Sequence, residues 1–155
     1  MKRLPLLLAT LATLALHGGP ATAFDLMDNA DLLASGELFE ARRPPVGEQY
    51  LGIAQLGHHN LAALDQSGTS LLGGIVQQGS HHEAFVLQQG EQLMASIWQQ
   101  GHGHQASILQ TGMNNQAQII QAGASNTATI QQSGTGLYSR VTQFGVGQTA
   151  HVVQR

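Results

Sequence analysis

The sequence contains no cysteine, so neither a disulfide framework nor a thiolate metal site can hold this chain together. Charged residues make up only 10% of it. From residue 49 onward the charged residues are Asp65, Glu83, Glu91, Arg140 and Arg155, with a net charge of −1. Lysine is absent after Lys2, which removes one common way of protecting exposed strand edges. Backbone hydrogen bonds must therefore supply stability that disulfides supply in other small proteins.

Glutamine, by contrast, recurs with a spacing of 11 residues that never slips. The series consists of Gln55, Gln66, Gln77, Gln88, Gln99, Gln110, Gln121, Gln132, Gln143 and Gln154. All but the last are followed two residues later by glycine, at Gly57, Gly68, Gly79, Gly90, Gly101, Gly112, Gly123, Gly134 and Gly145. A period held over about 100 residues indicates one structural unit stacked on itself. This pattern is typical of a protein built for assembly.

Small and aliphatic residues alternate with the glutamines inside each unit. With glutamine as position one, position eight is alanine in most units, and position ten is aliphatic in all of them. The aliphatic residues are Leu64, Ile75, Val86, Ile97, Ile108, Ile119, Ile130, Val141 and Val152. Alternation with a period of two predicts strands that carry these residues on one face. We expect each strand to run from about position six to the next glutamine, and the glycine with its polar neighbours to form the turn.

The structural repeat is expected to be 22 residues because position six differs between alternate units. It is polar in one set, at Asn60, His82, His104, Asn126 and Gln148, and mostly leucine in the other, at Leu71, Leu93, Asn115 and Leu137. The two half-repeats therefore form different strands, and strand, turn, strand and turn make one rung. The sequence predicts an all-β fold, a β-solenoid or cross-β stack of about five such rungs.

Residues 22 apart would lie directly above one another, which gives the glutamines a structural role. One amide ladder would contain Gln55, Gln77, Gln99, Gln121 and Gln143, and the other Gln66, Gln88, Gln110, Gln132 and Gln154. Each stacked amide can donate to the copy on one side and accept from the copy on the other, so a buried polar group is satisfied. Two roles are possible for these ladders: they stabilise the fold only, or they stabilise the fold and also act in templated assembly.

The N-terminus has the form of a secretory signal peptide. A basic start and an apolar stretch precede Ala21-Thr22-Ala23, which fits a small-residue cleavage site. We therefore expect a signal peptide over 1–23, a flexible N-terminal leader over 24–49 and a repeat solenoid over 50–155. A membrane anchor is less favoured because the apolar run is short and contains Pro5. Without the signal, four cations remain against nine acids, a net charge of −5, so nucleic acid is not an expected partner.

Histidines cluster after the same predicted strand in three consecutive rungs, at His58, His59, His81, His82, His102 and His104. One interpretation is simply a polar turn. The other is a pH-sensitive patch formed by His59, His81, His82 and His104, because protonated imidazoles stacked closely repel one another. No metal site and no cofactor are predicted, since no carboxylate or thiol recurs beside the histidines.

A second set of residues, which alternates with the inward set, is apolar although it should face outward. It consists of Phe85, Leu87, Trp98, Leu109 and Ile120. Such exposure indicates a contact surface, either between fibres or for an anchoring partner. An enzyme is not favoured, because the sequence lacks a nucleophile elbow, a phosphate loop and a recurrent histidine–carboxylate pair. An ice-binding solenoid is not favoured because it would need a regular threonine row, which the repeats lack. A leucine-rich repeat is not favoured either, because it would need several leucines per unit.

The repeats resemble those of curli subunits, the secreted bacterial amyloids. Their motif is Ser/Ala-x-Ile-x-Gln-x-Gly-x-x-Asn-x-Ala-x-Ile-x-Gln, and residues 106–121 of this chain follow it. Within the family the chain is most similar to the minor subunit, the nucleator. The alanines at position eight, the stretch from Leu71 to Gly79 and the Gln154-Arg155 ending carry that likeness. The chain departs from the motif where His82 and His104 replace asparagine.

This resemblance implies a secreted protein that passes through the periplasm to the bacterial cell surface and becomes part of a fimbrium. There it would nucleate polymerisation of the major curli subunit for biofilm matrix and adhesion, without enzymatic activity. The implied partners are the major subunit and the outer-membrane secretion and anchoring proteins, with residues 24–49 as the secretion tag. Self-association is compatible with this role, and the alternative is that the chain is the major fibre subunit itself.

Overall fold

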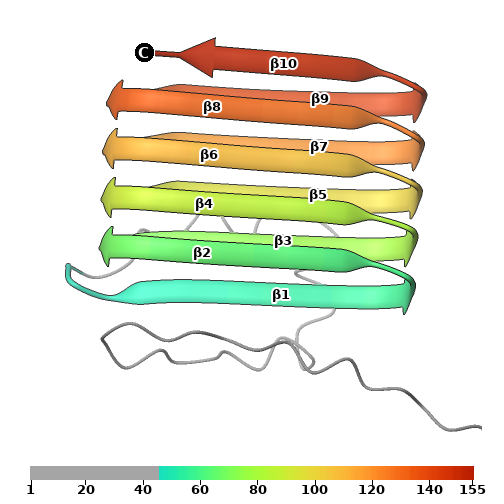
Figure 1. The fold of residues 1–155 in the computed structure, drawn as a ribbon, viewed down its shortest axis with the longest axis horizontal. Coiled ribbons are helices and arrows are strands. Elements are labelled where there is room, and N and C mark those ends of the chain that lie inside the picture. Colours follow the sequence, from blue (N-terminus) through green and yellow to red (C-terminus); the bar gives the residue numbers. More distant parts are fainter. Residues whose placement is uncertain (1–45) are drawn as a thin grey trace, which may run out of the picture.

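The computed structural model describes residues 46–155, which form ten β-strands (Figure 1). These are β1 (Gln49–His58), β2 (Leu61–Thr69), β3 (Leu71–Ser80), β4 (Glu83–Glu91), β5 (Met94–His102), β6 (Gln105–Met113), β7 (Gln116–Ala124), β8 (Thr127–Thr135), β9 (Tyr138–Val146) and β10 (Thr149–Gln154). The predicted signal peptide, 1–23, and the predicted leader up to residue 45 lie outside the described residues. No helix in residues 46–155 is long and apolar enough to cross a membrane.

Odd and even strands form two parallel sheets that face each other along the stack (Figure 1). Sheet A has the order β1-β3-β5-β7-β9, and sheet B has the order β10-β8-β6-β4-β2. Every ladder pairs residues 22 apart, as Gln77 pairs with Gln99 and Ile97 with Ile119. The predicted all-β solenoid of 22-residue rungs, about five in number, is thereby confirmed. Each strand therefore lies directly above the strand that comes two strands earlier in the chain.

The interior between the sheets is filled by the small and aliphatic residues of positions eight and ten. The predicted core residues Ile75, Val86, Ile97, Ile108, Ile119, Ile130 and Val141 are all buried there. Leu64 and Val152, in the terminal rungs, are only partly buried because they have neighbours on one side alone. Each fully buried aliphatic side chain contributes about 1.5–3 kcal/mol. Alanine at position eight allows the two sheets to lie close together across this thin core.

The chain reverses at positions five and six, and the prediction that the position-three glycines form the turn is corrected. Gly101 and Gly112 lie inside β5 and β6, although their φ angles of +127° and +114° are those expected of special glycines. The residue with left-handed φ, between 53° and 72°, is at position five: His59, Ser70, His81, Gln92, Gly103, Asn114, Ser125, Gly136 and Gly147. Glycine and serine occupy five of these nine positions, and these turn-forming residues were the available sequence signal for the reversal.

The glycines at position three are required by close contact between rungs as well as by their backbone angles. A Cβ atom built on Gly101 would lie 1.9 Å from the carbonyl oxygen of Gly123, and one on Gly112 would lie 2.0 Å from that of Gly134. Real Cβ atoms do not approach backbone oxygens this closely. The rungs can therefore stack at this point only if position three has no side chain.

Candidate functional site

The two glutamine series form continuous hydrogen-bonded columns inside the solenoid. In sheet A, Nε2 of each glutamine donates to Oε1 of the next, over 2.6 Å from Gln55 to Gln77, 2.9 Å from Gln77 to Gln99, 3.0 Å from Gln99 to Gln121 and 2.8 Å from Gln121 to Gln143. In sheet B the distances are 2.6 Å from Gln66 to Gln88 and 2.9 Å from Gln88 to Gln110, from Gln110 to Gln132 and from Gln132 to Gln154. All donor Nε2 atoms point toward the C-terminal end of the solenoid, so each column of hydrogen bonds runs in one direction.

Each glutamine amide also joins the two sheets. Nε2 of Gln99 in β5 donates a second bond of 3.1 Å to the carbonyl oxygen of Glu83 in β4, and the other interior glutamines repeat this contact to the residue 16 positions earlier. Gln77, Gln88 and Gln99 have almost no exposed surface, so these bonds satisfy amides that water cannot reach. The glutamines therefore fix both the register between rungs and the distance between sheets.

A third column occupies the turns that follow the odd strands, here called the histidine corner. It contains Asn60, His82, His104, Asn126 and Gln148. Oδ1 of Asn60 accepts from the backbone N–H of His82 over 3.1 Å, and Nδ1 of His82 accepts from the N–H of His104 over 3.2 Å. Nδ1 of His104 in turn accepts from the N–H of Asn126 over 3.2 Å. Histidine thus replaces asparagine in the ladder without breaking it.

The predicted histidine patch is divided by the structure into two parts. His82 and His104 are fully buried, and their rings stack with centroids 5.0 Å apart. His59 and His81 are exposed outside the corner, with ring centroids 4.9 Å apart. The sequence could not make this distinction, because consecutive residues of a turn can point to opposite sides. No group of three His, Cys, Asp or Glu residues within 46–155 is arranged to hold a metal ion.

The buried histidines are held in one neutral tautomer. Because a backbone N–H only donates, Nδ1 of each ring must accept, which leaves the proton on Nε2. Nε2 of His82 lies 3.2 Å from the carbonyl oxygen of Gln78, and Nε2 of His104 lies 3.0 Å from that of Gln100. Burial lowers the pKa of both rings, and the neighbouring imidazoles act in the same direction. A proton on Nδ1 would break the ladder.

Acid is therefore expected to destabilise the solenoid. Unfolded histidines gain protons around their ordinary pKa of 6.5, whereas His82 and His104 in the fold do so only at lower pH. Below pH 6.5 the unfolded chain consequently binds more protons, and stability falls as the pH falls. We expect the guanidinium midpoint of unfolding to be constant above about pH 7 and to decline between pH 6.5 and 5.

The double variant His82→Asn/His104→Asn is the matched control, because Asn60 and Asn126 already make the same ladder contacts in this column. It should keep the fold and lose most of the decline in midpoint below pH 6.5. An unchanged decline would show that His82 and His104 are not the source of the acid sensitivity.

The turns that follow the even strands form a different corner, here called the leucine corner. Its position-six residues are Leu71, Leu93, Asn115 and Leu137, of which Leu71 and Leu93 are fully buried. Asn115 donates 3.1 Å and 3.0 Å bonds to the carbonyl oxygens of Thr111 and Gly134. The leucines cannot make such bonds, so apolar burial replaces amide pairing in this corner.

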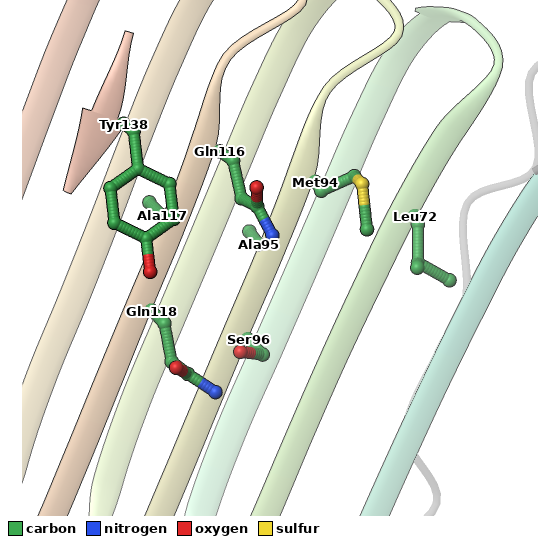
Figure 2. A pocket seen from close by; sticks show the side chains of 8 residues that line it. All are labelled: Leu72, Met94, Ala95, Ser96, Gln116, Ala117, Gln118 and Tyr138. Carbon is green, nitrogen blue, oxygen red and sulfur yellow. The ribbon is translucent and has the colours of Figure 1, made fainter. Parts of the chain in front are cut away.

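The outer apolar residues lie on two opposite faces rather than on one surface. Phe85, Leu87 and Leu109 are on sheet B, whereas Trp98 and Ile120 are on sheet A. Beside them on sheet A, Leu72, Met94, Gln116 and Tyr138 form one row along the stack (Figure 2). The hollow between this row and Ser96 and Gln118 measures about 20 Å³, room for about one water molecule. These faces suit side-by-side packing better than enclosure of a ligand.

The two ends of the described solenoid are incomplete ladders. At one end Ile53 is 41% exposed, although it continues a column that is buried from Ile75 onward. Oε1 of Gln66 is the one buried side-chain polar atom within residues 46–155 that has no hydrogen-bond partner. At the other end β9 and β10 are the last strands of their sheets. Both ends therefore expose unpaired backbone together with glutamine amides.

Stacked parallel strands, uniform register and polar amide columns define a β-solenoid of the kind that assembles by extending its own ladders. The family model described as Curlin associated repeat matches residues 57–90, 93–123 and 123–155, which is more than half of the chain. The chain therefore belongs to the curli subunit family, whose members are non-enzymatic components of extracellular fibres. No curated protein sequence matches this chain.

Proposed function

We propose that this chain is the minor, nucleating subunit of a curli fibre, which templates polymerisation of the major subunit at the bacterial cell surface. The observation that carries the proposal is the pair of incomplete ladders at the ends of an otherwise finished solenoid. An unfolded chain with the same 22-residue register can add its first rung there by backbone pairing. Without a template, ordering the first rung would cost chain entropy before a second rung could compensate with backbone hydrogen bonds.

The leucine corner supports a role as a template that folds ahead of its partner. Leu71 and Leu93 each bury a complete side chain in the first half of the stack. Each should contribute about 1.5–3 kcal/mol without waiting for an amide ladder to form on both sides. Early rungs stabilised in this way would present a finished end while the partner chain is still disordered.

Residues 24–49 would serve as the secretion tag after removal of the 1–23 signal peptide. The implied route leads through the periplasm and an outer-membrane curli pore to the cell surface, where an anchoring protein would retain the chain in the fimbrium. The uncharged outer face of β3 and β5 around Trp98 is a suitable contact for such an anchor. Biofilm adhesion would then follow from the fibres that the chain seeds.

The test is the lag phase of a purified curli major subunit, followed by amyloid-dye fluorescence. A sub-stoichiometric amount of this chain, assembled beforehand, should shorten the lag severalfold because it removes the slow nucleation step. The same amount of the Gly101→Ala variant, which should not form the solenoid, should leave the lag unchanged. Equal lags with and without the wild-type chain would refute the nucleating role.

The second candidate is that the chain is the major fibre subunit itself. The chemical match between its own two ends favours self-assembly and so supports this alternative. The two roles differ in one observable: a fibre subunit should polymerise to completion by itself at concentrations where a nucleator only accelerates another protein.

A further inference from the structure

The outer faces of the two sheets differ in charge. Within residues 46–155 no outward side chain of sheet A from β1 to β7 is charged, and Arg140 in β9 is the one charged residue of that face. Sheet B carries Asp65 in β2 and Glu83 in β4 on its outer face, and both are exposed. Burying carboxylates without partners is costly. Of the two faces, that of sheet A can therefore be covered at the lower cost.

A column of small residues lies beside a column of large ones on the outer face of sheet A. Position nine is Gly74 in β3 and Ser96 in β5, and position eleven is Val76 and Trp98 in the same strands. Ser96 lies low beside the row that contains Met94 (Figure 2), and it is 7% exposed although its position is an outward one. The face is therefore a shallow groove with a ridge beside it.

A two-fold axis parallel to the stack matches the groove of one copy to the ridge of another. Such a rotation reverses the strand direction across the contact but keeps every rung at the same height. With the axis between positions nine and eleven, Ser96 of one copy lies opposite Trp98 of the other, and Gly74 lies opposite Val76. The contact is isologous, because each copy offers both the groove and the ridge.

The same arrangement covers two exposed aromatic side chains of β9. Tyr138, at position seven, and Phe144, at position two, lie on opposite sides of this face and are 57% and 64% exposed. The two-fold axis places Tyr138 of one copy opposite Phe144 of the other. Aromatic pairs of this kind stabilise a contact beyond the area that they bury.

The size and periodicity of the face favour a second copy as the occupant. Five strands at about 4.8 Å and seven residues at about 3.3 Å give a face of about 550 Å². Two such faces bury about 1,100 Å² in total, just above the lower limit of about 1,000 Å² for a specific interface. A partner whose side chains do not repeat at the rung spacing would match only part of this face. A second solenoid matches it at every rung.

We propose that two copies of this chain pair side by side through the outer faces of sheet A, with Ser96 and Trp98 at the centre of the contact. Both stacks then point in the same direction, and the ends of each solenoid stay free. The pairing goes beyond the proposed function and does not depend on it, because a nucleator and a fibre subunit would pair in the same way. An anchoring protein that used the region around Trp98 would compete with the second copy.

Cross-linking tests the pairing directly, because the chain contains no cysteine. Full-length Gln118→Cys and Ile120→Cys chains, altered at positions nine and eleven of β7, are mixed, assembled and treated with a thiol–thiol linker. The linker spans about 10 Å, the usual distance between packed sheets. Copies in one stack carry these positions five rungs apart, about 24 Å, which the linker cannot reach. A covalent dimer therefore reports a lateral contact.

The matched control mixes Thr129→Cys with Gln131→Cys, at the same two positions of β8 in sheet B. The sheet A mixture should give covalent dimers and the sheet B mixture none. Dimers from neither mixture, or equally from both, would overturn the pairing. The linker reports paired solenoids whether or not they are also stacked. A chain that failed to shorten the lag of the major subunit would count against the proposed function and leave this test intact.

Ser96→Glu provides an independent measurement. The new carboxylate would face Trp98 of the second copy without a cationic partner. The fold itself should tolerate it, because Gln118 and Arg140 occupy the same column in later rungs. The mass per length of fibres in electron microscopy should fall about twofold, since single solenoids replace pairs. Ser107→Glu, at position nine of β6 in sheet B, should leave it unchanged. A wild-type mass per length for Ser96→Glu would refute the pairing and leave this face to an anchoring partner.

Discussion

Replacing Gly101 by alanine is expected to abolish the solenoid rather than weaken it. The new Cβ would lie 1.9 Å from the carbonyl oxygen of Gly123, in a backbone conformation with φ of +127° that L side chains rarely adopt. Backbone strain of this kind costs about 1–3 kcal/mol by itself. The overlap adds to it, because ladders above and below fix both backbones. Circular dichroism should therefore show no sheet signal under conditions in which the wild-type chain assembles.

Gly103→Ala is the matched control for this experiment. Gly103 is two residues farther along and also has positive φ, +67°, but the nearest atom to its built Cβ is Oγ of Ser125 at 3.6 Å. His59 and His81 occupy the equivalent position in other rungs. The control should retain the sheet signal, with a loss of about 1–2 kcal/mol in stability. A Gly101→Ala variant that folded as well as this control would contradict the close approach of the rungs.

Removing the Gln99 amide is expected to have the second-largest effect. Gln99→Ala deletes three hydrogen bonds inside the stack, with Gln77 at 2.9 Å, Gln121 at 3.0 Å and the carbonyl oxygen of Glu83 at 3.1 Å. Each orphaned buried group costs about 1–3 kcal/mol, and the vacated volume adds a cavity term, so the total loss should be on the order of 5 kcal/mol. The guanidinium midpoint should fall accordingly, or assembly should cease.

Gln100→Ala is the control that separates the effect of losing a buried ladder amide from the effect of losing any glutamine. Gln100 is the next residue, but its side chain is exposed and makes a single 3.4 Å bond to Gln78. Its replacement should change the free energy of unfolding by less than about 0.5 kcal/mol, so the guanidinium midpoint should hardly move. Equal effects of the two substitutions would mean that the buried column contributes no more than surface polarity does.

The glutamine columns illustrate how far sequence reasoning reached in this protein. An 11-residue spacing with two kinds of half-repeat required residues 22 apart to be stacked, and Gln77, Gln99 and Gln121 are stacked in that way. The second bond of each amide, across to the opposite sheet, could not be derived. It depends on how closely the sheets approach, which is set by alanines such as Ala95 and Ala117 packing in the interior.

The turns show where the same reasoning was insufficient. Glycine suggested the reversal point, but Gly101 lies within β5 and the reversal follows at Gly103 and His104. The glycine is required for close contact with Gly123 in the next rung, and nothing local to residues 99–104 reveals that contact. Likewise, the neighbours His81 and His82 have equal polarity in the sequence, yet one is exposed and the other buried.

The sequence alone determined the strand period, the inward set of residues and the 22-residue register, because side-chain alternation and strict repetition are properties of the chain itself. The tertiary structure decided which turn residues are buried, why glycine is required at position three, and how the two ends differ. Those features arise from atoms of neighbouring rungs, such as the Gly123 oxygen above Gly101 or the missing partner of Gln66. Contacts between rungs become definite only when the stack is formed.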